Sequence, residues 1–320
     1  MDKLYQSILQ IFPGDKRAFF EYVASREKMV NEIRLRCEKP ILVTEGGREY
    51  FLNKQGAYTK HLAEAVRINQ KDLESIIQHV CHYSLYAFEE ELKQGYITVA
   101  GGHRIGVVGQ VVMEGNGQIR TIKNIRGLNI RVSHQLKGVS EPILPYLYKQ
   151  GTFSNVLIVS PPGCGKTTLL RDIVRNVSDG NAYAEGMTVG VVDERSEIAG
   201  SFMGQPQNDV GIRTDVLDAC PKALGMMLLL RAMSPKVIAI DELGNEEEIA
   251  AVKTIVACGS KVVATMHGND LQDIRQRSSM EKLLQASCFD VILFLGREQG
   301  RCVLKEIYEK ARNGDWECRK

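Results

Sequence analysis

The sequence predicts a mixed α/β fold with a mostly parallel sheet, preceded by a smaller α+β domain. In the second half of the chain, short apolar runs alternate with segments of helical periodicity, which is typical of strands joined by helical crossovers. Most of these apolar runs end in polar motifs, and parallel sheets bind ligands at the carboxyl ends of their strands. The predicted strands are 155–159, 187–192, 236–240, 261–264 and 291–295, with 301–308 as the return strand of a terminal hairpin.

The length of 320 residues suits about two domains. We place their boundary before Gly151, which separates an α+β domain, 1–150, from the α/β domain, 151–320. The first domain is expected to contain both helices and β-hairpins, and its glycine pairs mark turns between strands. Its predicted elements are helices at 3–11, 16–29, 140–148 and from Asp72 onward, a strand at 32–36, a hairpin over 40–52, and β-rich runs over 96–132.

The composition is that of an ordinary globular chain. Its 41 basic and 39 acidic residues give a net charge of +2, which gives no support to a nucleic-acid partner. None of the eight cysteines lies in a zinc-ligand pattern, so we expect no zinc and a reducing compartment. The first residues lack the apolar core of a signal peptide, and we expect a cytoplasmic protein that reaches a membrane only through partners.

The segment 160–168 has the pattern of a phosphate-binding loop, between a predicted strand and a predicted helix. There, main-chain N–H groups and the helix dipole create an anion site. Lys166 is expected to reach the β- and γ-phosphates of ATP, and the Thr167 hydroxyl to bind Mg²⁺. The first glycine of the usual pattern is replaced by serine. The predicted nucleotide-binding residues are Ser160, Pro161, Pro162, Gly163, Cys164, Gly165, Lys166, Thr167 and Thr168.

A second motif follows the apolar run 236–240, which ends in Asp241 and Glu242. Hard cations prefer oxygen ligands, so Asp241 is expected to hold Mg²⁺ directly or through water. Glu242 is expected to orient and polarise the attacking water as a catalytic residue. A solvated acidic loop is the alternative, and the phosphate loop upstream favours the catalytic interpretation.

Two further predicted strands end in polar motifs. Asp193 is predicted to bind the metal and Glu194 to position water, although a charged helix start would give the same pattern. Thr265 and His267 are expected near the γ-phosphate, where an imidazole could sense the state of the nucleotide.

Phosphoryl transfer spreads negative charge over the γ-phosphate oxygens, and an arginine from a neighbouring subunit can stabilise it. Arg213 is favoured for this role because it lies in a polar segment that contains glycine and lacks clear periodicity. Arg104, Arg126 and Arg131 remain alternatives, and each could equally be an ordinary surface residue.

With these motifs in place, the second half resembles the secretion ATPases of type II and type IV systems and their pilus-motor relatives, which are RecA-like P-loop NTPases. Their phosphate loop, acidic box, later glutamate and histidine box correspond here to 160–168, 193–197, 241–242 and 265–267. Those relatives often lack an aspartate where this chain has Asp241, so the match at that point is to the broader superfamily.

The chain as a whole resembles a family of sporulation ATPases of endospore-forming bacteria. This resemblance implies a homo-hexamer in which the N-terminal domain contributes to the subunit interface. It also implies membrane-embedded partners in a secretion-like complex between mother cell and forespore. Besides the phosphate loop, the residues that carry it are 32–36, 101–104, 128–131, 193–197 and 213–217.

The leading hypothesis is therefore an ATP-hydrolysing motor that uses Mg²⁺. One alternative is a nucleic-acid-stimulated translocase or helicase on the same fold, because a fold does not fix a function. Another is an ATP-dependent assembly switch with low turnover. The balanced charge argues mildly against the first alternative, and the presence of Glu242 argues against the second.

Overall fold

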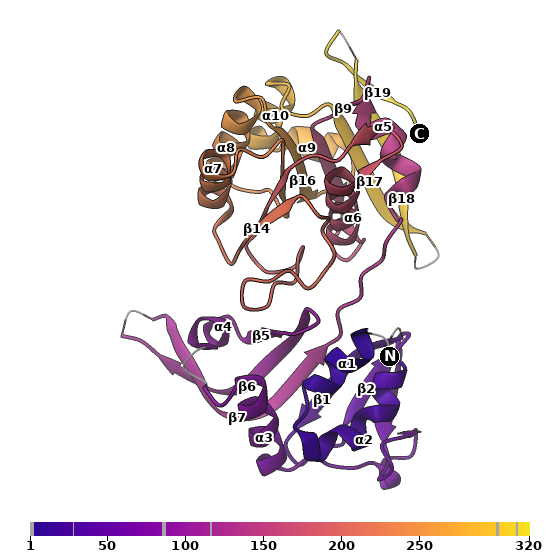
Figure 1. Ribbon diagram of the computed structural model, residues 1–320, viewed down its shortest axis with the longest axis vertical. Coiled ribbons are helices and arrows are strands. Elements are labelled where there is room, and N and C mark those ends of the chain that lie inside the picture. The colour runs from indigo at the N-terminus through magenta and orange to yellow at the C-terminus, as the bar shows by residue number, and fades with distance from the viewer. Residues whose placement is uncertain (1–2, 28, 85–87, 116, 299–300, 312) are drawn as a thin grey trace. The chain divides into compact units, whose positions relative to one another are not determined.

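The structure is a computed structural model that describes residues 3–27, 29–84, 88–115, 117–298, 301–311 and 313–320 (Figure 1). The chain divides into two compact units, 1–134 and 135–320. The sequence places the boundary later, before Gly151. The structure groups 135–150 with the second unit because Ile143, Leu144 and Leu147 are buried in the core of that unit.

The first unit is built on a seven-stranded antiparallel sheet in the order β4-β3-β2-β1-β7-β6-β5. Helices α3 and α4 both contact β7. The strands are β1 (Val30–Arg36), β2 (Leu42–Glu45), β3 (Arg48–Leu52), β4 (Tyr58–Thr59), β5 (Tyr96–Val99), β6 (His103–Met113) and β7 (Ile119–Arg131). The helices are α1 (Lys3–Gln10), α2 (Gly14–Ser25), the 3₁₀ helix η1 (Leu62–Glu64), α3 (Gln70–Val80) and α4 (Glu89–Lys93).

The predicted hairpin over 40–52 is confirmed as β2 and β3. The predicted turn at Gly101 is confirmed between β5 and β6, where that residue has a φ of +84°. Such a left-handed conformation suits glycine, which lacks a Cβ. The start of α3 differs from the prediction, because the side chain of Asn69 caps it and accepts the N–H of Asp72 at 2.9 Å. Asp72 lies instead in the first turn, where the helix dipole favours a negative charge.

His103 connects three separate segments inside the first unit. Its ring is fully buried, and Nδ1 accepts the main-chain N–H of Ser133 at 3.1 Å. That bond places the proton of the neutral ring on Nε2, which donates to the Ser7 hydroxyl at 2.8 Å. Burial, with a smaller effect of nearby His134, lowers the pKa of His103 to about 4. The neutral imidazole therefore ties helix α1 and β6 to the chain just before residue 135.

We expect the stability of the first unit to fall as the pH drops from 6.5 to 4. The unfolded chain takes up a proton at the ordinary histidine pKa, whereas His103 in the folded unit resists protonation down to about pH 4. The loss attributable to this residue by pH 4 is on the order of 2–3 kcal/mol. Urea unfolding of wild-type and His103→Gln proteins at several pH values measures it, with the exposed His61→Gln as control. Equal acid sensitivity in all three proteins would contradict the prediction.

The second unit is built on an eight-stranded sheet in the order β14-β13-β15-β16-β10-β17-β18-β19. Neighbouring strands in the series β14-β13-β15-β16-β10-β17 pair in parallel, and β18 and β19 pair antiparallel at the end of the sheet. The strands are β10 (Val156–Ser160), β13 (Val189–Asp193), β14 (Thr214–Asp218), β15 (Val237–Ile240), β16 (Lys261–His267), β17 (Val291–Glu298), β18 (Arg301–Lys310) and β19 (Trp316–Cys318). Two short hairpins are formed by β8 (Tyr148–Lys149) with β9 (Thr152–Phe153) and by β11 (Gly180–Asn181) with β12 (Ala184–Glu185).

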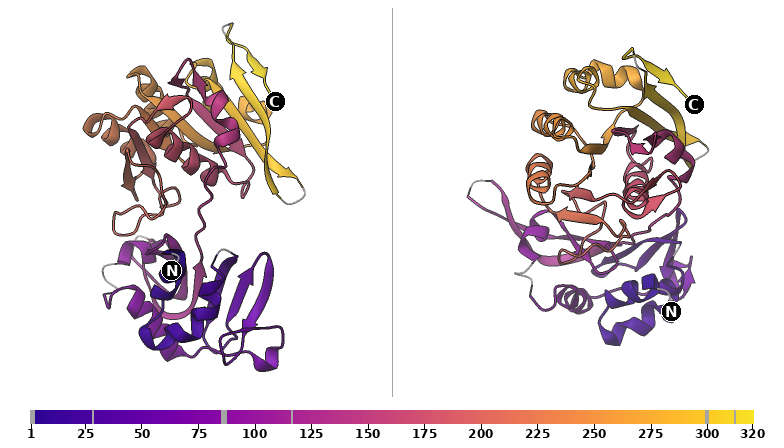
Figure 2. Two further views of the ribbon diagram at one scale, coloured as in Figure 1. Left: turned by 45° about the vertical axis from the view of Figure 1, so that its right-hand side comes forward. Right: turned by 45° about the horizontal axis from the view of Figure 1, so that its top comes forward.

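Helices cover both faces of this sheet (Figure 2). Alternate residues of the central strand β10 enter two separate cores, with Val156 and Ile158 on the face of α6 and Leu157 and Val159 on the face of α7 and α8. This arrangement follows from the strand's period of two, and it explains why the predicted strands are continuously apolar. The helices are η3 (Glu141–Ile143), α5 (Leu144–Leu147), α6 (Lys166–Asp179), α7 (Lys222–Ala232), α8 (Glu246–Ala257), α9 (Leu271–Gln276) and α10 (Ser278–Gln285).

Two features of the second unit were not predicted. Strand β14 lies at an edge of the sheet and is only partly buried, so its residues lack the apolar signal of the central strands. Ser140, which precedes the 3₁₀ helix η3, makes no side-chain cap bond; its hydroxyl and its N–H donate to the buried carboxylate of Asp172 at 2.7 and 2.8 Å. Among the described residues, no helix is both long and apolar enough to cross a bilayer.

Candidate active site

The predicted phosphate loop joins β10 to the first turn of α6. Gly163 and Gly165 have φ values of +69° and +82°, a region that favours glycine, so the loop depends on both. Ser160, at the position of the missing glycine, is fully buried, and its hydroxyl donates to the carbonyl of Pro161 at 2.8 Å. A serine therefore fits at the start of the loop. Cys164 is buried within it.

Lys166 lies over the loop. Its Nζ is 3.4 Å from the carbonyl oxygens of Ser160 and Pro161 and 3.1 Å from Nδ1 of His267. Burial lowers the pKa of Lys166 below its usual value, and the charges of Asp241 and Glu242 oppose that shift. The sequence motifs around this lysine thus come together in one cluster.

Asp241 links α6 to β16. Its Oδ2 accepts the hydroxyl of Thr167 at 2.6 Å, and its Oδ1 accepts the hydroxyl of Thr265. The predicted metal pair, Thr167 and Asp241, is therefore in direct contact. Within the described part of the chain, no group of three or more His, Cys, Asp or Glu side chains could hold a metal ion by itself. This donor set suits Mg²⁺, which usually takes one or two carboxylates together with substrate phosphates.

Glu242 is held in a left-handed conformation with a φ of +54°, which is rare for a residue other than glycine. Its N–H donates to Thr265 Oγ1 at 2.9 Å, and its carbonyl accepts from Lys222 Nζ at 2.6 Å. Its carboxylate lies between His267 Nε2 at 3.0 Å and Arg195 Nη1 at 2.8 Å. Such conformations persist where the surroundings fix them, and they cluster at functional sites.

The neighbours of His267 define its tautomer. The ammonium of Lys166 can only donate, so Nδ1 of a neutral His267 accepts from it. The proton of the ring then lies on Nε2, which donates to Glu242 Oε1. His267 therefore connects the phosphate-binding lysine to the predicted catalytic carboxylate.

The carboxylate of Asp193 binds main-chain groups of its own loop. Its carboxylate accepts the main-chain N–H groups of Glu197, Ile198 and Ala199 at 2.7–3.1 Å and is 2% exposed. Burial raises the pKa of Asp193, although these hydrogen bonds oppose the shift. Arg171 of α6, also buried, donates to the carbonyls of Glu197 and Ile198. These contacts support a structural role, so they do not favour the expectation that Asp193 binds Mg²⁺.

We expect Asp193→Asn to destabilise the second unit by about 2–4 kcal/mol. The amide nitrogen would face main-chain N–H groups, and the buried Arg171 would lose a nearby negative charge. Urea unfolding measures the change, and Asp215→Asn, an exposed position on β14, is the matched control. A stability equal to that of the control would show that the loop does not need the carboxylate.

The remaining predicted residues lie farther from the phosphate loop. Glu194 pairs with Lys222 at 3.5 Å. Arg213 precedes β14, at the edge of the sheet opposite the strand ends, and donates to the carbonyl of Ser178 at 2.9 Å. Arg213 therefore does not reach the site of its own subunit, and its role toward a neighbouring subunit stays a prediction.

Sequence reasoning missed Lys222, Arg171 and Arg195. Lys222 begins α7, where the helix dipole disfavours a cation, and this unusual placement was the available signal. It reaches the carbonyl of Glu242 and the buried carboxylate of Glu248, the latter at 3.1 Å. Arg171 and Arg195 give no comparable sign, because arginines are common on helices and loops.

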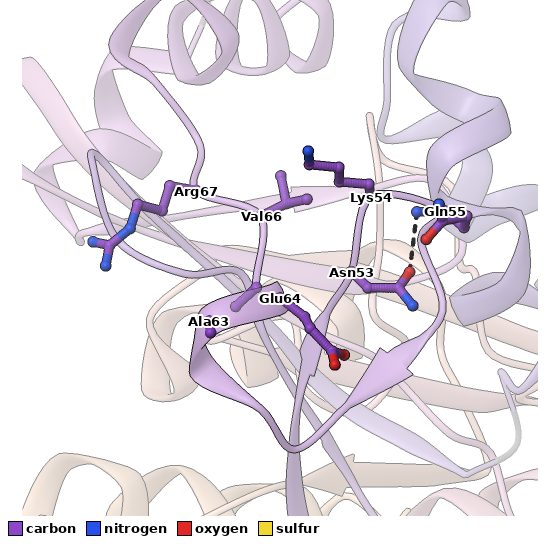
Figure 3. Close-up of a pocket in the computed structure, with 8 residues that line it drawn as sticks. Asn53, Lys54, Gln55, Ala63, Glu64, Val66 and Arg67 are labelled. Carbon is purple, nitrogen blue, oxygen red and sulfur yellow. Dashed lines mark hydrogen bonds between the residues drawn. The ribbon is translucent and has the colours of Figure 1, made fainter.

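The first unit contains a separate surface depression of about 730 Å³, formed by residues 53–55 and 63–67 (Figure 3). The side chains of Lys54 and Arg67 point in different directions there. Arg67 donates to the carbonyl of Glu38 at 2.9 Å, and Glu64 accepts from Thr59 at 2.7 Å. Because these polar groups do not converge on one point, we assign no ligand to this depression.

The fold is similar to that of solved secretion and pilus-motor ATPases. The ATPase DotB of Legionella pneumophila matches it with a TM-score of 0.61 and 16% identity, over 95% of this chain and 84% of that one. The pilus retraction motor PilT, solved with bound ADP, also has a TM-score of 0.61, with 15% identity over 90% of this chain and 81% of that one. At these identities the likeness shows the fold alone.

The sequence comparisons identify the particular family. Residues 2–314 match the family described as sporulation stage III, protein AA. Stage III sporulation protein AA of Bacillus subtilis (strain 168) is 39% identical over 307 residues, which are 96% of this chain and 95% of that protein. The chain therefore belongs to the sporulation stage III protein AA family.

Proposed function

We propose that this chain is an ATP-hydrolysing motor of a secretion-like transport complex that acts in sporulation. The observation that carries the proposal is the connected chain of contacts from the phosphate loop to Glu242. Thr167 contacts Asp241, Lys166 contacts His267, and His267 contacts a glutamate whose backbone is held in a rare conformation. This connected cluster supports the chemistry that a P-loop ATPase requires.

Each residue of the site has its own role in hydrolysis. Lys166 and the N–H groups of the loop bind the phosphates, and Thr167 and Asp241 would hold Mg²⁺, which neutralises phosphate charge when bound. Glu242 accepts a hydrogen bond from the attacking water and orients it. His267 changes partner when the phosphates draw Lys166 away from Nδ1, and so reports the state of the nucleotide to Glu242.

The oligomeric state, partners and location that we propose for the motor rest on its family and its fold. We propose a homo-hexamer in which residues 1–134 contribute to the subunit interface. A neighbouring subunit then supplies an arginine to the γ-phosphate, with Arg213 the leading choice. Membrane-embedded components of the complex would recruit the protein from the cytoplasm of the mother cell. The presence of Glu242 in a fixed position favours a working hydrolase over a nucleotide-dependent assembly switch.

Phosphate release by the purified full-length chain tests the proposal. We expect MgATP to be hydrolysed, EDTA to stop the reaction, and single-stranded DNA or RNA to leave the rate unchanged. Absence of hydrolysis in the assembled oligomer would favour the assembly switch. Stimulation of tenfold or more by single strands, lost at high salt, would favour a nucleic-acid translocase.

A further inference from the structure

Arg195 lies beside Glu242, and neither the sequence motifs nor the proposed function gives it a role. It lies in the loop that follows β13, and its Nη1 donates to Glu242 Oε2 at 2.8 Å. His267 holds the other carboxylate oxygen. The carboxylate is thus oriented from two sides by groups from two different strand ends, and each oxygen still has a lone pair for a water hydrogen.

The loop that carries Arg195 is fixed on both sides of it. Before it, the buried carboxylate of Asp193 binds three N–H groups of residues 197–199. After it, Ser196 has a φ of +51°, and its hydroxyl donates to Asp218 at 2.6 Å. From α6, Arg171 donates to the carbonyls of Glu197 and Ile198 in the same loop. These contacts hold the main chain around Arg195 in place, so its side chain extends from a defined position.

A small polar cavity lies against the same contact. Its volume is about 20 Å³, and Arg195, Glu242, Asp241, Lys222 and Glu194 are among the residues that line it. A polar cavity of this size is large enough for one water molecule, which needs about 10–15 Å³ of such space. Arg195 therefore borders the space into which the Glu242 carboxylate would direct a water.

The ion pair itself contributes little to folding. The side chain of Arg195 is 65% exposed and that of Glu242 31%, and exposed pairs are screened by solvent. The effect of Arg195 is thus expected on the orientation of the carboxylate. A small misplacement of a catalytic group can cost about a hundredfold in rate, whereas the affinity for the nucleotide depends on other residues.

We propose that Arg195 is a positioning residue that orients the Glu242 carboxylate toward the attacking water. This inference rests on the proposed ATPase function. Arg195→Ala is expected to lower kcat about tenfold to a hundredfold, with KM for MgATP and the melting temperature unchanged. Arg195→Lys restores most of the rate, because the pair is a single contact that an ammonium can reproduce. Arg319→Ala, which removes two exposed ion pairs, with Glu309 and Glu317, beside the β18–β19 hairpin, is the matched control and leaves kcat unchanged.

A double-mutant cycle with Glu242→Gln separates this role from others. If Arg195 acts through Glu242, adding Arg195→Ala to Glu242→Gln causes no further loss in single-turnover hydrolysis. Additive losses would mean that Arg195 acts directly on the phosphates, and a faster Arg195→Ala would mean that it restrains Glu242; either result overturns the inference. An inactive Glu242→Gln with a fully active Arg195→Ala overturns this inference alone. Wild-type turnover by Glu242→Gln overturns it together with the proposed function.

Discussion

Glu242→Gln is expected to reduce ATP hydrolysis by at least about a hundredfold while MgATP still binds. A general base contributes about 10²–10⁴ to a rate, and glutamine keeps the size of the side chain but cannot take a proton. The amide oxygen can still accept from one neighbour, and the contacts of the main chain with Thr265 and Lys222 do not involve the side chain. The unusual backbone conformation should therefore survive the change.

Phosphate release at saturating MgATP measures the loss, and equilibrium binding of ATP checks that affinity is kept. Glu247→Gln is the matched control, because it removes an exposed carboxylate a few residues away at the start of α8. Hydrolysis at the wild-type rate would refute the assignment of Glu242. A loss of both binding and hydrolysis would instead indicate that the carboxylate shapes the nucleotide site.

The central part of this site could be predicted because it is built on strand ends. Apolar runs reveal buried parallel strands, and the residues after them meet at one edge of the sheet. Asp241 and Glu242 follow β15, and His267 is the last residue of β16, its neighbour in the sheet. Their closeness to the phosphate loop then follows from the pairing of β10 with β16.

Other parts of the site depend on contacts that no local pattern records. The carboxylate of Asp193 looks like a metal ligand in sequence, but the chain turns back and presents three N–H groups to it. The positive φ of Glu242 results from Thr265 and Lys222, which are distant in sequence. The sequence places residues 135–150 in the first domain, with a helix at 140–148, and only the packing of η3 and α5 joins them to the second unit.

Lys166→Ala is expected to weaken ATP binding by about a hundredfold or more. Hydrogen bonds to charged groups are worth about 1.5–3 kcal/mol, and the lysine is placed to serve two phosphates. The folded protein should tolerate the change well. Lys166 is buried, burial lowers its pKa, and its own hydrogen bonds to Ser160 and Pro161 are long, at 3.4 Å. Removing it therefore removes a desolvated charge, two long contacts and the 3.1 Å contact with His267.

Thermal unfolding with and without MgATP separates binding from folding. A ligand that binds only the folded state stabilises it by RT ln(1 + [L]/Kd), which is about 2.7 kcal/mol at a hundredfold excess over Kd. Wild-type protein and the exposed control Lys149→Ala should therefore melt at higher temperature when MgATP is added. Lys166→Ala should melt near the wild-type temperature without nucleotide and show no increase with it. If MgATP raises the melting temperature of Lys166→Ala as much as that of the wild type, the phosphates do not contact this lysine. The loop at 160–168 would then bind its anion through main-chain N–H groups alone.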